Sequence, residues 1–107
     1  MNNTVRSVFV LAIVASLSCA VSLAQSSGEA TYKARCQNCH GTAGLANSGI
    51  GKIMKVKPVT DPAARNMSLA GMIDATAKGS GKMQGYKGDL TDAQIKSAVE
   101  YYRTFIK

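Results

Sequence analysis

The chain has 107 residues, of which 46% are hydrophobic and 18% are charged, and its 13 basic and 6 acidic side chains give a formal net charge of +7. This length allows one small domain. A basic surface favours anionic partners. However, the sequence has no basic helix with interleaved aromatic residues and no nucleic-acid-binding motif, so we expect no nucleic-acid function.

Residues 1–24 have the pattern of a secretory signal peptide. Arg6 precedes an apolar run over residues 8–17, and Ser22-Leu23-Ala24 is a small-x-small cleavage signal. The apolar run is too short for a membrane span, which needs about 20 largely apolar residues. A lipoprotein signal ending at Cys19 is an alternative, although the leucine usual three residues before such a cysteine is missing. We therefore expect export to a bacterial periplasm, without stable membrane insertion after cleavage.

The mature domain is predicted to span residues 25–107. Removal of the leader leaves 83 residues with a formal charge of +6 and two cysteines, both within one short motif, so no structural disulfide is available. At this size an apolar core alone is marginally stable, and small domains usually add a metal, a disulfide or a cofactor. We expect a monomer that needs a bound group to fold.

The motif is Cys36-Gln37-Asn38-Cys39-His40, and C-x-x-C-H is the attachment signature of c-type haem. On a helical turn, residues three and four apart share a face, so the two thiols can reach the edges of one porphyrin while the imidazole lies under the iron. The motif therefore predicts one haem c, bound covalently by Cys36 and Cys39 and ligated by His40.

Two other uses of C-x-x-C are a thiol redox site and half of a zinc site. A redox motif would lie in an alternating strand and helix pattern, and a zinc site needs further Cys or His ligands. The only other cysteine is Cys19 and the only histidine is His40. Haem attachment is thus the favoured interpretation.

The mature sequence predicts helices and no strands. A first helix is expected over residues 29–35, an irregular glycine-rich loop over 41–51, and a helical turn over 62–66 with Asp61 as its N-cap. Ser68 caps a clearer helix that stops at Gly79, with Leu69, Met72, Ile73 and Thr76 on one face, so Met72 is expected in the core.

The last predicted helix runs from Asp92 towards Lys107 and opens with a capping box between Thr91 and Gln94. Its buried face is expected to hold Ile95, Ala98, Val99, Tyr102 and Ile106. No alternating strand pattern of useful length is present, so we predict an all-α domain.

The second axial position of the iron decides between electron transfer and ligand binding. No second histidine is available. Met54 lies only 14 residues past His40, whereas Met83 lies in the middle of the long glycine-rich loop of residues 79–88. We predict Met83 as the distal ligand, whose soft thioether would raise the potential.

At this point the sequence resembles a family. The Cys36–His40 motif, the Gly79-Ser80-Gly81-Lys82-Met83 loop and the ending Ala98-Val99-Glu100-Tyr101-Tyr102-Arg103-Thr104 look like a small bacterial class I cytochrome c, over residues 28–107. The resemblance implies three to five short helices around one covalent haem, with the N- and C-terminal helices crossing. It also implies His40 and Met83 as axial ligands.

The resemblance further implies that Gly28 and Tyr32 of the first helix cross Ala98 and Tyr101, with Tyr102 turned towards the haem. Two departures from the family pattern stand out. The loop after His40 lacks the usual proline whose carbonyl accepts the imidazole proton, and Gln84, not proline, follows Met83. The acceptor for His40 and the propionate partners are therefore unassigned.

The predicted function is electron transfer without catalysis, by a carrier that exchanges electrons with redox proteins bearing acidic patches. Lysines 52, 55, 57, 78, 82 and 87 flank the two haem-side loops and would steer such partners. One alternative is a haem protein with a labile Met83 that binds a small gas or peroxide. Another is a cytochrome subunit of a larger redox complex.

Overall fold

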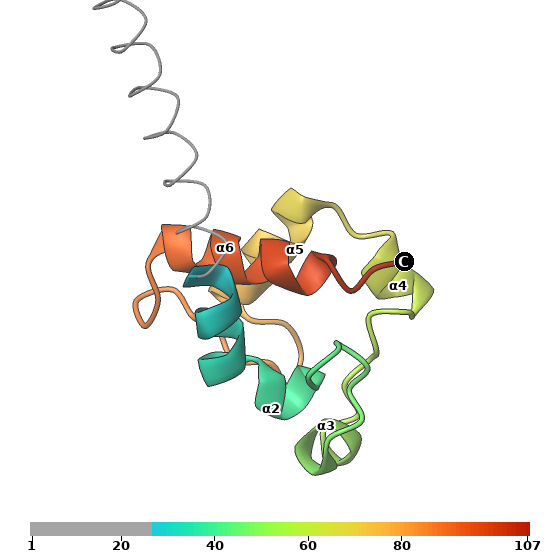
Figure 1. The fold of residues 1–107 in the computed structure, drawn as a ribbon. Coiled ribbons are helices and arrows are strands. Elements are labelled where there is room, and N and C mark those ends of the chain that lie inside the picture. The colour runs from blue at the N-terminus through green and yellow to red at the C-terminus, as the bar shows by residue number, and fades with distance from the viewer. Residues whose placement is uncertain (1–26) are drawn as a thin grey trace, which may run out of the picture.

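The computed structural model describes residues 27–107, and these residues form helices and turns (Figure 1). The helices are residues 27–35, α2 (Gln37–His40), α3 (Gly49–Ile53), α4 (Pro62–Arg65), α5 (Leu69–Lys78) and α6 (Asp92–Arg103). Extended pairing within the described residues is limited to two isolated bridges, Ser80 with Met83 and Lys87 with Leu90. The predicted all-α fold is confirmed.

The predicted leader, residues 1–24, lies outside the described residues. Among residues 27–107 no helix has the length and the apolar character that crossing a membrane requires.

The caps predicted for α4 and α5 are present. The Asp61 carboxylate accepts a hydrogen bond from the Ala63 N–H at 2.9 Å, and the Ser68 hydroxyl accepts one from the Gly71 N–H at 3.0 Å. Gly79 ends α5 with a φ of +88°, in the left-handed region that favours glycine. The Asp61 and Ser68 side chains thus accept from backbone N–H groups that the start of a helix leaves unpaired.

Helix α6 begins as predicted and ends earlier than predicted. Thr91 and Gln94 form the full capping box, with reciprocal bonds of 3.1 and 2.9 Å. The helix ends at Arg103. The backbone N–H groups of the next three residues donate to the carbonyl three residues earlier, which is the tighter hydrogen-bond pattern of a 3₁₀ turn. The Thr104 hydroxyl reinforces this turn by donating to the Tyr101 carbonyl at 2.6 Å.

The prediction of an irregular loop over residues 41–51 was wrong in its last part. Helix α3 begins at Gly49, and the Ser48 hydroxyl caps it by accepting from the Gly51 N–H at 3.0 Å. The glycines gave this segment a low helix propensity. Capping and packing against neighbouring backbone outweigh that low propensity.

The main core lies between α5 and α6, which pack side by side (Figure 1). Its buried centre is Met72, Ile95 and Val99. The partly buried residues around this centre are Leu69, Ile73, Ala77, Tyr86, Leu90, Tyr102 and Ile106. Met72 is only 7% exposed, so its prediction as a core residue is confirmed.

The first helix, residues 27–35, crosses α6 (Figure 1), and the two backbones approach closely at Gly28. A Cβ atom on Gly28 would collide with the carbonyl oxygen of Ser97. One turn later, the Tyr32 and Tyr101 rings lie 5.3 Å apart, and the neighbouring Ala98 is 3% exposed. The crossing of the N- and C-terminal helices is therefore present, with Ser97 backbone as the closest partner of Gly28.

Replacing Gly28 with alanine is expected to destabilise the folded protein by about 2 kcal/mol or more, since overpacking against backbone costs roughly 1–3 kcal/mol or occasionally more. Alanine is the better helix former by about 1 kcal/mol, so intrinsic propensity acts in the opposite direction. Thermal unfolding of the haem-loaded protein measures the difference. Gly49→Ala is the matched control because a Cβ there meets nothing within 4 Å. Equal stability of both variants and the parent would contradict the tight crossing.

Candidate functional site

The Cys36–His40 motif forms one helical turn at a break in the helix. Cys36 is the N-cap of α2, and its carbonyl accepts hydrogen bonds from the Cys39 N–H at 3.2 Å and the His40 N–H at 3.0 Å. Both cysteines are free thiols and partly buried. The structure thus brings the two predicted thioether residues and the predicted proximal ligand together on one short turn.

The chemistry of the thiols argues against a redox C-x-x-C. Burial raises the pKa of the Cys36 thiol to about 11, and the nearby Arg35 charge offsets only part of this rise. Disulfide exchange is carried by the thiolate, which redox enzymes favour by lowering the pKa of the attacking cysteine. Residues 27–107 also contain no group of three or more His, Cys, Asp or Glu side chains arranged to hold a metal ion.

His40 is prepared to act as a neutral ligand. Burial lowers the pKa of its imidazole, so the uncharged ring that binds metals predominates at neutral pH. Its Nδ1 atom is buried and has no hydrogen-bond partner. The Tyr102 ring packs against the imidazole edge to face, with centroids 5.2 Å apart, so Tyr102 lies next to the predicted proximal ligand.

Tyr32 connects the helix crossing to the motif. It is 1% exposed, and its hydroxyl donates to the carbonyl of Gly41, the residue after His40, at 2.6 Å. Burial raises the pKa of this hydroxyl, which therefore stays a donor at all physiological pH values. Its ring also contacts three aromatic side chains of the C-terminal segment, namely Tyr101, Tyr102 and Phe105. The crossing helices thus fix the chain directly after His40, the predicted proximal ligand.

Helix α3 is packed backbone to backbone against α2. The Ser48 hydroxyl donates to the Asn38 carbonyl at 2.5 Å while it caps α3. A Cβ on Gly51 would collide with the Cys39 carbonyl oxygen. This role of Ser48 was not predicted, although serine is a preferred N-cap residue and Ser48 directly precedes Gly49, the first residue of α3.

The loop after His40 is held without the family's proline. The Ala46 N–H donates to the His40 carbonyl at 2.8 Å, and the Val59 N–H donates to the Gly44 carbonyl at 2.8 Å. Gly44 has a φ of +71° and lies against the rings of Tyr102 and Phe105, where a side chain would crowd them. None of these bonds uses the imidazole Nδ1, so its acceptor stays unassigned.

Met83 lies on a separate turn. Its N–H donates to the Ser80 carbonyl at 2.9 Å, and the Ser80 N–H donates to the Met83 carbonyl at 3.0 Å, closing a four-residue turn with Gly81 at a φ of +56°. A side-chain hydrogen bond joins this loop to the motif segment, from the Tyr86 hydroxyl to the Arg35 carbonyl at 3.1 Å. Sequence reasoning missed this link because its two residues are 51 positions apart.

These residues fit a covalently bound haem. Two thiols and a neutral imidazole project from a single turn, as the attachment chemistry requires. The buried Nδ1 atom leaves the other ring nitrogen, Nε2, as the one available to ligate iron. The described residues therefore have the donor set for a c-type haem at Cys36, Cys39 and His40.

Comparison with known families agrees with this chemistry. No curated protein matches the chain. A family model described as "Cytochrome C oxidase, cbb3-type, subunit III" matches residues 24–101, which include the motif, the Met83 loop and most of α6. This match covers most of the chain, whose small size suits a class I cytochrome c and whose described residues form an all-α fold. The chain therefore belongs to that family and is a c-type cytochrome.

Proposed function

We propose that this protein is an exported, soluble carrier of single electrons that works in the bacterial periplasm and catalyses no reaction of its own. The observation that carries the proposal is the Cys36–His40 turn, where two thiols and a buried neutral imidazole lie together in a chain of a c-type cytochrome family. One haem c bound there supplies a one-electron iron couple.

The protein's side chains divide the work of holding that group. Cys36 and Cys39 would form the thioethers, and His40 would ligate the iron. Met83, on the turn closed by Ser80, would supply a second iron ligand through its sulfur. A thioether favours the ferrous state relative to a second nitrogen ligand, so Met83 sets a comparatively high reduction potential.

A closed iron suits electron transfer better than catalysis. With both His40 and Met83 as ligands, the haem iron would have no open position for a substrate. His40 is the only histidine among the described residues, and burial lowers the pKa of its imidazole. Transfer then depends on the distance and orientation of a partner at the protein surface.

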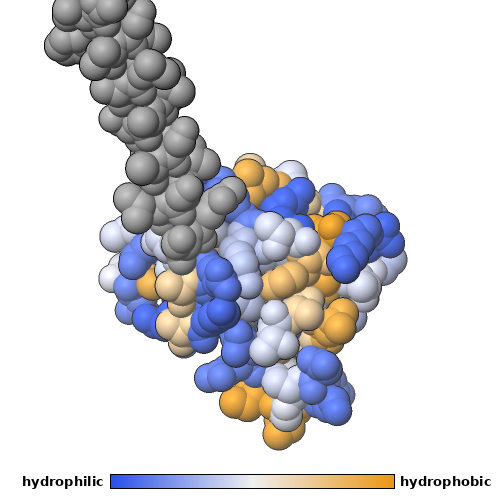
Figure 2. Space-filling model, in the orientation of Figure 1, coloured by the Kyte–Doolittle hydropathy of each residue, from blue (hydrophilic) through white to orange (hydrophobic). Residues whose placement is uncertain are grey.

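The surface at α3 is suited to a transient redox partner. Ile50 and Ile53 are 49% and 76% exposed, and Figure 2 shows apolar surface at the end of the molecule where α3 lies. Lys52 and Lys55 extend from the same segment and are exposed. A small apolar patch beside lysines favours a partner with an acidic rim, because opposite charges raise the encounter rate.

The family description favours a second candidate function. The matching model is described as an oxidase subunit, so this chain would be the cytochrome subunit of a larger complex rather than a free carrier. Purification of the native protein without detergent separates the two functions. A fixed partner that remains through size-exclusion chromatography supports the subunit, and a single small haem protein supports the carrier.

The Met83→Ala variant tests the distal ligand. We expect the ferric absorption spectrum of the parent to contain a methionine sulfur-to-iron charge-transfer band, and we expect this band to be lost completely in the variant. Met67→Ala is the control, since Met67 is 41% exposed and lies on the connection before α5. An unchanged low-spin spectrum with the band still present in Met83→Ala would assign the ligand elsewhere.

The Lys52→Gln variant tests the docking surface. Ferricyanide is a small anionic oxidant, and we expect it to oxidise the reduced variant about two- to threefold more slowly than the parent at low ionic strength, because one attracting charge is lost. Added salt should remove the difference, since it screens exposed charges. Lys96→Gln on α6 is the matched control with the same change in net charge. An equal slowing in both variants, measured by stopped flow, would argue against electron exit near α3.

A further inference from the structure

The loop that carries Met83 is fixed firmly on the side that faces α5. The Tyr86 N–H donates to the Thr76 carbonyl and the Lys87 N–H donates to the Ala77 carbonyl, both at 3.0 Å. A Cβ on Gly85 would lie only 2.7 Å from the carbonyl carbon of Lys78, so backbone packs on backbone there. These contacts hold the base of the loop to α5, which contributes none of the residues of the haem-attachment motif.

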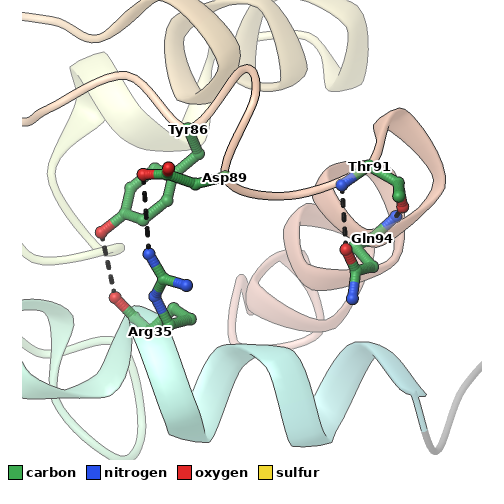
Figure 3. Close-up of polar contacts among 5 residues, drawn as sticks. All are labelled: Arg35, Tyr86, Asp89, Thr91 and Gln94. Carbon is green, nitrogen blue, oxygen red and sulfur yellow. Dashed lines mark hydrogen bonds and ion pairs between the residues drawn. The ribbon is translucent and has the colours of Figure 1, made fainter.

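On the side of the motif, the polar side-chain contacts to the Met83 loop and to Asp89, the residue after it, all involve Arg35 among the described residues (Figure 3). The Tyr86 hydroxyl donates to the Arg35 carbonyl at 3.1 Å. The Arg35 guanidinium lies over the Tyr86 ring, 5.4 Å from its centroid, and reaches the Asp89 carboxylate at 3.8 Å. We call this group of three residues, Arg35, Tyr86 and Asp89, the loop clamp.

The residues of the loop clamp lie close in sequence to the predicted haem-binding residues. Arg35 directly precedes Cys36, and Tyr86 follows Met83 by three residues. The clamp therefore joins the start of the haem-attachment turn to the loop of the distal methionine. Gln84 stands after Met83 where the resembled family usually has proline, so the loop lacks one source of rigidity.

The three contacts of the loop clamp differ in weight. The ion pair is long, and its side chains are 40% and 60% exposed, so water and salt weaken it. The Tyr86 ring packs against the core of α5 and α6, which fixes the position of its hydroxyl. The hydrogen bond from that hydroxyl to a backbone carbonyl is exposed too, but at 3.1 Å it is shorter than the ion pair, and it loses little side-chain entropy because the ring is already held. It is therefore the main contact.

We propose that the loop clamp is a positioning device that holds the Met83 loop against the start of the haem-attachment turn and so would limit how often the Met83 sulfur leaves the iron. This inference rests on the proposed function, in which Met83 is the distal ligand. Tyr86 acts through the loop and does not touch the iron. With the loop clamp intact, the protein would work as an electron carrier with both iron ligands in place. Without it, the iron would bind added ligands more readily.

The test is the limiting rate at which the ferric protein binds imidazole, because at saturating imidazole this rate equals the rate of methionine release. Tyr86→Phe keeps the ring and removes only the hydroxyl. We expect its limiting rate to rise by roughly three- to tenfold, the range that corresponds to losing one hydrogen bond of ordinary strength. Arg35→Gln should raise the rate less, because the backbone carbonyl remains.

Two controls separate positioning from general stability. Tyr101→Phe removes a hydroxyl from α6, outside the loop clamp. Ser68→Ala removes the N-cap of α5 at the end far from Gly79, so it lowers the unfolding temperature without touching the loop. Neither control should change the imidazole rate by as much as twofold, whereas a rise in Ser68→Ala equal to that in Tyr86→Phe would overturn the proposal.

The outcomes also separate this inference from the proposed function. If the parent has the methionine charge-transfer band, loses it in Met83→Ala and binds imidazole at the same rate in Tyr86→Phe, the clamp is wrong and the carrier proposal stands. If the parent lacks the band, Met83 is not the ligand and both proposals fail.

Discussion

The contact of Tyr32 with the segment after His40 is the constraint on which the rest of the structure depends. Its hydroxyl holds the Gly41 carbonyl, and its ring packs among the aromatic side chains at the end of α6. Burial of one large aromatic ring stabilises a fold by roughly 2–3 kcal/mol. Gly28 allows this packing by letting the two helices touch through their backbones. One crossing therefore stabilises a small domain and also holds the chain next to His40, the predicted proximal ligand.

Much of the fold followed from local patterns in the sequence. Asp61, Ser68 and the Thr91 capping box each begin a helix with side chains that bond the nearby backbone, and Gly79 ends α5 through its positive φ. These features depend on only a few neighbouring residues. The buried faces of α5 and α6 followed from helical spacing. Helix α3 did not, because glycine has a poor helix propensity and its favourable packing on the Cys39 carbonyl is a tertiary contact.

The candidate site divides in the same way. Five consecutive residues define the haem-attachment turn, so the sequence alone predicted Cys36, Cys39 and His40 together. The burial that lowers the pKa of His40 and the link from Tyr86 to Arg35 arise from segments far apart in the chain. No local pattern predicts such contacts. Met83 combines both situations. Its loop was predictable from the glycines around it, whereas the contacts of the loop clamp that join this loop to Arg35 were not.

The central claim is that Met83 closes the iron opposite His40. Proton NMR of the ferrous protein tests it directly, because the porphyrin ring current shifts a methionine methyl group strongly upfield when its sulfur ligates the iron. With methionine methyl groups isotopically labelled, we expect one such resonance, and we expect it to vanish in a variant that lacks Met83. A spectrum without an upfield methyl, or one whose upfield methyl belongs to Met54 or Met67, would contradict the account.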